Sequence, residues 1–366
     1  MIKFADLYSQ YQSIRPEIDA AIAAVIRDAA FISGRYAKLF EAEFSAFLGG
    51  GHCVGVGNGT DAIEIAIEAL KLPAGSEIIV PANTFIASSE AVTRSAHRVV
   101  FADVDPGCYT ITADAVLRKL SPRTSAVMAV HLYGHPCDMD ALDDVAARHG
   151  LQIIEDCAQA HGAKYKGRQV GTIGRVATFS FYPGKNLGAF GDAGAITTLD
   201  ADLAAQARKI ANHGRIGKYD HDFEGRNSRL DGLQAAVLSA KLPSLAKWTA
   251  RRVEIAERYC AGLRGIPDLI LPVRMPWAYQ VYHLFVVRTP RRDALKEHLA
   301  ARGIECGVHY PIALPRLAAY EYLGQASEAM FANEVAGSLL SLPIGEHLTD
   351  ADIDEVIDTI SRFLSK

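Results

Sequence analysis

The sequence lacks several features that would place it in a specialised class of protein. Its 366 residues include only six cysteines, and no two of them form a CxxC pair. We therefore expect neither a disulfide framework nor a zinc site, and no metal. Charges interrupt every apolar run before the roughly 18 residues that a membrane span requires. The first residues, Met1 to Asp6, carry no charged segment followed by an apolar one, so we expect no signal peptide and a cytoplasmic protein.

A strong charge of either sign is also missing. The net charge is -4, the isoelectric point is near 6.3, and no block of five or more basic residues occurs. This balance argues against a nucleic-acid or membrane-surface partner. The hydrophobic fraction of 49% is ample for burial, and the length suits two domains or one large one.

Short apolar runs alternate with helical patterns through about the first 240 residues. This rhythm predicts an α/β fold whose sheet is mostly parallel and is covered by helices. The expected strands are 54–56, 77–80, 98–102, 126–130, 152–155, 177–181 and 193–198, and the expected helices are 61–70, 141–148 and 203–212.

The regular alternation of strands and helices ends in the last third of the sequence. Two helices are expected at 230–242 and 246–263, the second with Trp248, Ile255 and Tyr259 on its apolar face. A strand at 281–288 and helices at 292–302 and 351–364 complete a smaller α+β unit. We place the boundary near residue 245, giving a large domain of 1–245 and a small one of 246–366.

One lysine and one aspartate stand at informative places. Lys185 lies in a Pro-Gly turn directly after an apolar strand, and Asp156 ends an earlier apolar run. Taken singly, they fit a surface lysine and a helix-capping aspartate. Together, a lysine that forms a Schiff base and an acid that keeps a pyridine nitrogen protonated are the working pair of pyridoxal phosphate chemistry.

The segment from Gly57 to Asp61 has the composition of an anion site. It follows a strand and opens an amphipathic helix, so Gly59 and Thr60 can present backbone N–H groups and a hydroxyl to a phosphate. It matches neither GxGxxG nor GK[ST], which excludes the common nucleotide fingerprints. The alternative is a glycine-rich turn with Thr60 as its N-cap.

Three further side chains follow expected strands. Phe85 can stack on a planar ring at the carboxyl end of a strand, although an isolated phenylalanine is more often core. Gln159 lies about one turn beyond Asp156 and can donate to an oxygen on the edge of the same ring. His161 is more simply explained as a satisfied structural group.

The motifs in this order resemble the sugar aminotransferases of the DegT/DnrJ/EryC1/StrS family, which have the type I pyridoxal phosphate fold of aspartate aminotransferase. The resemblance covers nearly the whole chain, and its most specific segments are Asp-Cys-Ala-Gln-Ala-His from residue 156 and Ser-Phe-Tyr-Pro-Gly-Lys-Asn-Leu-Gly from residue 180. Weaker parts include Gly225 to Ala236 and His309-Tyr310-Pro311.

The resemblance assigns roles to residues of this sequence. It implies that Lys185 forms the Schiff base and moves a proton, that Asp156 protonates the pyridine nitrogen, and that Gln159 bonds the ring hydroxyl. It implies a phosphate cradle of Gly59, Thr60 and Ser180 and a stacking role for Phe85. Asn227 matches a position that reaches the phosphate of a neighbouring subunit, which implies a homodimer with shared sites. Tyr182, His309 and Tyr310 match a region that approaches the sugar.

The implied reaction moves an amino group from L-glutamate to a keto group of a nucleotide-linked sugar, through pyridoxamine phosphate. The motif wording resembles members that aminate C-3 of dTDP-3-keto-6-deoxyhexoses, for a surface polysaccharide such as O-antigen or a glycosylated metabolite. Lys185 separates the chain from a branch that has histidine there and dehydrates sugars. Pro315-Arg316 departs from the His-Leu common in the family and leaves the sugar contacts open.

Three alternatives remain at this point. Amination at C-4 is the nearest. A regulatory protein that binds the cofactor or sugar nucleotide without turnover is disfavoured by the intact Lys185, Asp156 and Gln159. Another type I enzyme, a lyase or desulfurase acting on an amino acid, would need no large sugar-nucleotide cleft.

Overall fold

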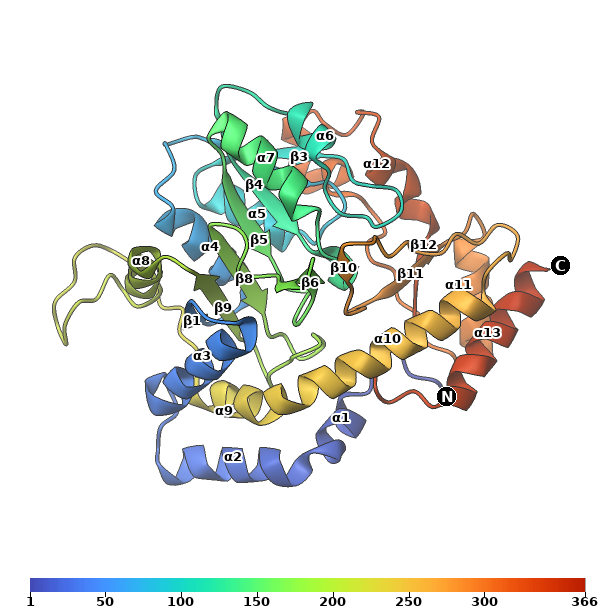
Figure 1. Cartoon of the computed structure of the whole chain (residues 1–366), viewed down its shortest axis with the longest axis horizontal. Coiled ribbons are helices and arrows are strands. Elements are labelled where there is room, and N and C mark those ends of the chain that lie inside the picture. The colour runs from blue at the N-terminus through green and yellow to red at the C-terminus, as the bar shows by residue number, and fades with distance from the viewer. Residues whose placement is uncertain (366) are drawn as a thin grey trace.

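A seven-stranded sheet forms the centre of the molecule (Figure 1). The structure is a computed structural model and describes residues 1–365. The strand order is β1-β9-β8-β5-β4-β2-β3. Only β9 runs against its neighbours β1 and β8, and the remaining pairs are parallel. The bounds are β1 (His52–Val56), β2 (Glu77–Pro81), β3 (Arg98–Ala102), β4 (Thr124–Val130), β5 (Gln152–Asp156), β8 (Val176–Ser180) and β9 (Gly194–Thr198).

All seven strands expected from the sequence are confirmed. They could be found because helices cover both faces of the sheet, so strands such as β2 and β9 are buried along their whole length and read as continuous apolar runs. The mostly parallel α/β class is confirmed with them.

Helices pack on the two faces of this sheet in separate cores. One core takes its side chains from α4 (Gly59–Ala69), α5 (Ala87–Arg94) and α8 (Ala201–Ala211). On the other side, α3 (Gly34–Leu48) and α9 (Gly232–Lys241) form a second core, and α6 (Ala113–Leu117) and α7 (Met139–His149) a third. The sheet thus presents its strand ends, rather than its faces, to a ligand.

The N-terminal helices were not expected from the sequence. Helix α1 (Leu7–Ser13) has a single buried side chain, Gln10, and α2 (Arg15–Arg27) begins with a proline in its first turn and packs against α9. Helix α1 has too few apolar contacts to give a periodic signal.

The C-terminal part is built on α10 (Leu245–Gly262), α11 (Arg292–Ala301) and α13 (Asp350–Leu364), with a two-stranded sheet of β11 (Phe285–Arg288) and β12 (Leu339–Leu342). The expected strand 281–288 is wrong in its first half. Tyr282 has φ of +46°, which breaks an extended strand, and the N–H of Val281 bonds instead to the carbonyl of Gly134 at 3.0 Å. Strand β12 was missed.

This smaller unit has its own core, and the N-terminus takes part in it. Ile2 is buried with Ile255, Phe285 and Ile353. The division at residue 245 stays a prediction, and it coincides with the first residue of α10. The other elements are β6 (Lys164–Tyr165), β7 (Arg168–Gln169), β10 (Ala278–Tyr279), α12 (Phe331–Val335) and short 3₁₀ turns. No helix within residues 1–365 is both long and apolar enough to cross a bilayer.

Candidate active site

A cavity of about 380 Å³ opens where the parallel strands of the sheet end. It is lined by residues that follow β1, β2, β4, β5 and β8, the usual place for a ligand in an open α/β sheet. Most of the residues predicted from the sequence lie in its wall. They are Gly59, Thr60, Phe85, Asp156, Gln159, Ser180, Tyr182, Lys185 and Tyr310.

The N-terminus of α4 forms one end of the cavity. Its N-cap is Asn58, whose Oδ1 accepts a hydrogen bond from the N–H of Asp61 at 2.8 Å, so the alternative with Thr60 as the cap is wrong. A Cβ on Gly59 would lie 2.6 Å from the Cβ of Ser180. Only glycine therefore lets the first turn of this helix come so close to Ser180, and the dipole of α4 favours an anion there.

Asp156 is the last residue of β5, and both of its carboxylate oxygens are bonded. Oδ2 accepts from the hydroxyl of Ser88 at 2.7 Å, and Oδ1 accepts from the N–H of Ala158 at 3.1 Å. The Ser88 hydroxyl is also 3.0 Å from that of Thr84. The sequence analysis missed Ser88, because a serine inside a helix carries no motif that points to Asp156.

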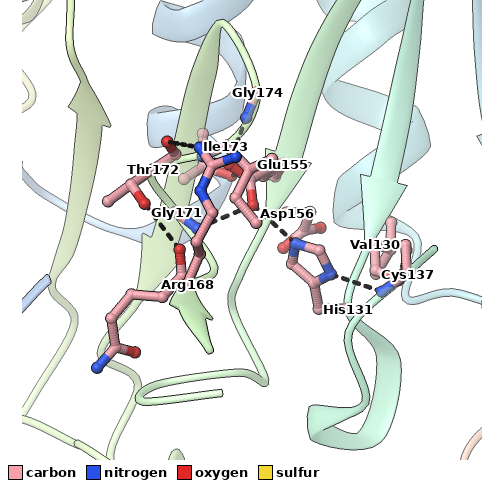
Figure 2. Close-up of polar contacts among 12 residues, drawn as sticks. Val130, His131, Cys137, Glu155, Asp156, Arg168, Gly171, Thr172, Ile173 and Gly174 are labelled. Carbon is pink, nitrogen blue, oxygen red and sulfur yellow. Dashed lines mark hydrogen bonds and ion pairs between the residues drawn. The ribbon is translucent and has the colours of Figure 1, made fainter. Parts of the chain in front are cut away.

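Glu155 precedes Asp156 in β5, and its hydrogen bonds fix this end of the strand (Figure 2). Adjacent residues of a strand point to opposite faces, so the two carboxylates are separated. Glu155 accepts hydrogen bonds from the N–H groups of Gly171, Ile173 and Gly174 at 2.8–2.9 Å, and its Oε2 lies 3.0 Å from Nε2 of His131. Burial alone would raise the pKa of Glu155, but these donors hold it below its usual value.

The same network fixes the tautomer of His131. Its Nδ1 accepts from the N–H of Cys137 at 3.0 Å, so Nε2 is the nitrogen that donates to Glu155 (Figure 2). The Glu155 carboxylate thus connects the end of β5 to the residue after β4 and to the loop before β8. Asp156 therefore projects from a rigid base.

Lys185 enters the cavity from the turn after β8. Its backbone N–H bonds to the carbonyl of Tyr182 at 2.8 Å, which closes the turn. Burial lowers the pKa of the Lys185 amine from 10.5 to about 8, and the charge of Asp156 opposes the shift only in part. An amine in this environment is partly uncharged, and hence nucleophilic, near pH 8.

Gln159, Tyr310 and Phe85 form another part of the wall. Gln159 accepts from the N–H of Tyr133 at 2.7 Å and donates to the hydroxyl of Tyr310 at 3.2 Å. The rings of Phe85 and Tyr310 lie 5.6 Å apart, and Phe85 is 53% exposed. Phe85 is thus not a core residue but an aromatic surface that a planar group can cover.

Two predicted residues do not line the cavity. His309 stacks on Phe4 at 5.8 Å, and its Nδ1 lies 2.8 Å from the hydroxyl of Ser341. Asn227 is exposed, and its backbone pairs with Asn212 beyond α8.

His161 is buried beside Lys185, against Phe179 and Phe181. Its ring nitrogens make no hydrogen bond to a side chain among the described residues, and the expectation that His161 is a structural group stays a prediction. Burial, reinforced by the charge of Lys185, lowers the pKa of His161 to about 3.

The groups present fit pyridoxal phosphate. The close approach of Gly59 to Ser180 at a helix N-terminus suits a phosphate, and Phe85 offers a face to a ring. The Asp156 carboxylate and the Lys185 amine supply the anion and the nucleophile that this chemistry uses. The cavity volume lies within the range common for small-molecule sites.

Comparisons with known proteins agree with this reading. Residues 12–361 match the profile of the DegT/DnrJ/EryC1/StrS aminotransferase family. The chain is 45% identical to the dTDP-3-amino-3,4,6-trideoxy-alpha-D-glucose transaminase of Streptomyces venezuelae, over 100% of this chain and 97% of that protein.

Solved structures show the same likeness. The crystal structure of S. venezuelae DesV in complex with a ketimine intermediate has a TM-score of 0.97 and 45% identity, covering 100% of this chain and 99% of that one. The structure of ntda from Bacillus subtilis with bound cofactor PMP has a TM-score of 0.89 and 28% identity, covering 97% of this chain and 82% of that one.

Proposed function

The chain belongs to the DegT/DnrJ/EryC1/StrS aminotransferase family, and from that premise we propose that it aminates C-3 of a dTDP-linked 3-keto-6-deoxyhexose with L-glutamate as the donor. It is a pyridoxal phosphate-dependent aminotransferase. The observation that carries the proposal is the cavity in which Lys185, Asp156 and Phe85 meet the N-terminus of α4. The Streptomyces relative, whose name specifies a 3-amino sugar, supports position C-3.

Each side chain has a distinct task in this proposal. Pyridoxal phosphate, when bound, supplies a carbonyl that bonds amines and a ring that draws electrons. The Lys185 amine would hold this group and would move a proton to and from the substrate carbon. Asp156, held by Ser88 and by the N–H of Ala158, would keep a proton on the ring nitrogen because an adjacent anion favours the charged form.

The remaining tasks concern binding. Gly59, Thr60 and Ser180 would hold the phosphate, Phe85 would cover one face of the ring, and Gln159 would bond the ring hydroxyl. Tyr182 and Tyr310, on the cavity wall, would approach the sugar. His309, which makes its contacts with Phe4 and Ser341, is the weakest of the proposed sugar residues.

We propose a homodimer in which Asn227 completes the phosphate site of the partner. Asn227 is exposed and is not among the residues that line the cavity of its own chain, which supports this role. The phosphate carries nearly two negative charges, and a second chain adds an amide donor and excludes water. The smallest active unit would be a C₂ dimer.

The product would be an amino-deoxysugar for a surface polysaccharide or a glycosylated metabolite. Amination at C-4 is the nearest alternative. A mass-resolved assay with L-glutamate and enzymatically generated 3-keto and 4-keto dTDP-6-deoxyhexoses tests the proposal. A mass gain only with the 3-keto sugars is expected, whereas a gain only with the 4-keto sugars would contradict the C-3 assignment. Turnover of an amino acid without any keto-sugar acceptor would contradict sugar amination altogether.

A further inference from the structure

A second buried lysine, Lys241, lies at the C-terminal end of α9. Its side chain is only 2% exposed. Its Nζ donates to the carbonyl of Gly188 at 2.7 Å and to Oε1 of Gln10 at 3.0 Å, and it stands 4.7 Å from the centre of the Phe190 ring. A buried ammonium is costly unless it is bonded, so a lysine here rather than a leucine calls for a reason.

The partners of Lys241 on one side belong to the turn that carries Lys185. Gly188 is packed so tightly that a Cβ there would collide with the carbonyl of Pro183. The N–H of Phe190 donates to Oε1 of Gln234 at 2.8 Å. Gln234 and Lys241 are seven residues apart on α9 and share one face. Helix α9 thus holds the far end of the turn at two points.

On the other side, Lys241 is connected to charges of the C-terminal part. Gln10 donates from Nε2 to Oε1 of Glu346 at 2.6 Å, and Oε2 of Glu346 lies 3.7 Å from Nη2 of Arg252. Arg252 donates from Nη1 to the carbonyls of Ile344 at 3.1 Å and Tyr282 at 3.3 Å. Burial lowers the pKa of Lys241 to about 8, and the charge of Glu346 opposes this.

The polar chain then returns to the turn. Asn186, which follows Lys185, donates from Nδ2 to the carbonyl of Val281 at 3.2 Å, so its Oδ1 is free to accept. The Nδ1 of His283 lies 3.1 Å from that oxygen and acts as the donor. Arg252 also bonds the carbonyl of His283 at 3.4 Å. The series of polar contacts therefore starts at Gly188 of the turn, passes through Lys241, and ends at Asn186 of the same turn.

We propose that Lys241 is a positioning residue for Lys185: its ammonium fixes the Gly188 carbonyl and, through Gln10, Glu346 and Arg252, closes a ring of polar contacts around the Lys185 turn. This ring joins α1, α9 and α10, which lie together along one side of the molecule (Figure 1), to the base of the cavity. The inference rests on the proposed function only in taking Lys185 as the reacting amine.

The ring gives a reason for a charged side chain at position 241. Apolar side chains at 10 and 241 would fill the space but could not bond the Gly188 carbonyl or Glu346, and buried polar groups without partners destabilise the folded state. A ring whose members are hydrogen-bonded, or ion-paired as Glu346 and Arg252 are, holds the turn in fewer positions than apolar packing would.

Amide hydrogen exchange in the cofactor-free protein is the first test. In Lys241→Met, peptides covering 183–190 should exchange about tenfold faster than in the original protein, which corresponds to about 1.4 kcal/mol of local opening. Peptides from β2 and β4 should not change. Lys247→Met is the matched control, since Lys247 is an exposed lysine of α10, and it should change nothing.

The second test separates the ring from simple packing. Lys241 and Glu346 communicate through Gln10, so the effects of Lys241→Met and Glu346→Gln on exchange at 183–190 should be less than additive when combined. In the holoenzyme, Lys241→Met should lower kcat about tenfold with little change in the KM for the sugar. Lys241→Arg, which keeps charge and donors, should recover part of the loss.

Three outcomes would overturn the inference: unchanged exchange at 183–190, an equal rise over the whole chain, or full additivity of the two substitutions. If Lys241→Met does not fold, Lys241→Gln, which can still donate to Gly188 but carries no charge, is measured against the same criteria. Because exchange is measured without sugar or cofactor, a failed sugar assay would overturn the proposed function and leave this inference untouched.

Discussion

The charge state of Lys185 gives the most quantitative prediction. The perturbation is pH, applied to the cofactor-free protein. The cavity lowers the pKa of the Lys185 amine from 10.5 to about 8. Each pKa unit changes the ratio of amine to ammonium tenfold, so near pH 7 the reactive fraction is raised by roughly 300-fold over an unshifted lysine.

The assay is competitive reductive methylation, with each lysine quantified by peptide mass spectrometry between about pH 6 and pH 10. The rate at Lys185 should rise about tenfold per pH unit in acid and level off near pH 8. Lys247, which is exposed, supplies the reference rate. In Asp156→Asn, the plateau should begin at lower pH, because the Asp156 charge opposes the shift and its removal lowers the pKa of Lys185 further.

The same shift has a consequence for stability. A lysine whose pKa is lower in the folded than in the unfolded state prefers the folded state when uncharged. The contribution of Lys185 to cofactor-free stability should therefore increase as pH rises from about 8 to 10.5 and be constant below that range. A Lys185 methylation rate that still climbs tenfold per unit above about pH 9 would refute a pKa lowered by the cavity.

Three further experiments test the site. Asp156→Asn should retain some cofactor yet slow the proton transfer by several orders of magnitude in stopped-flow absorbance, and a rate within about tenfold of the original would contradict its role. Gly59→Ala should weaken cofactor binding at least about tenfold in equilibrium dialysis, because its Cβ would lie 2.6 Å from that of Ser180; unchanged binding would show that the helix can move aside. Mixing Lys185→Ala with Asn227→Ala, each nearly inactive alone, should restore partial activity in exchanged dimers, and an active monomer would disprove the shared site.

The sequence predicted where the main site residues lie because the strands of the sheet can be recognised in it. In a buried parallel sheet the strands are apolar along their length, and their carboxyl ends meet at one edge. The sequence alone therefore places Asp156 and Lys185 in one region, with Phe85 nearby.

What the sequence could not predict depends on contacts between distant segments. Gln10 and Lys241 are separated by most of the large domain and carry no motif, yet they bond each other. Ile2 joins a core formed by residues beyond 250. The prediction of a strand at 281–288 is wrong in its first half. The apolar residues there are buried but not extended, because the backbone at Tyr282 has a positive φ.

The reversed direction of β9 limits how this protein can vary in length. Since β8 and β9 are antiparallel neighbours, with Ser180 paired to Gly194, residues 181–193 leave and re-enter the sheet at the same edge. A parallel β9 would instead require a crossover, usually through a helix, that returns to the opposite end of the sheet. Lys185 thus sits on a connection whose two ends are fixed side by side in the sheet. Insertions and circular permutation should be tolerated in the exposed segment 215–222, but even one residue added within 181–193 should displace the amine from the cavity.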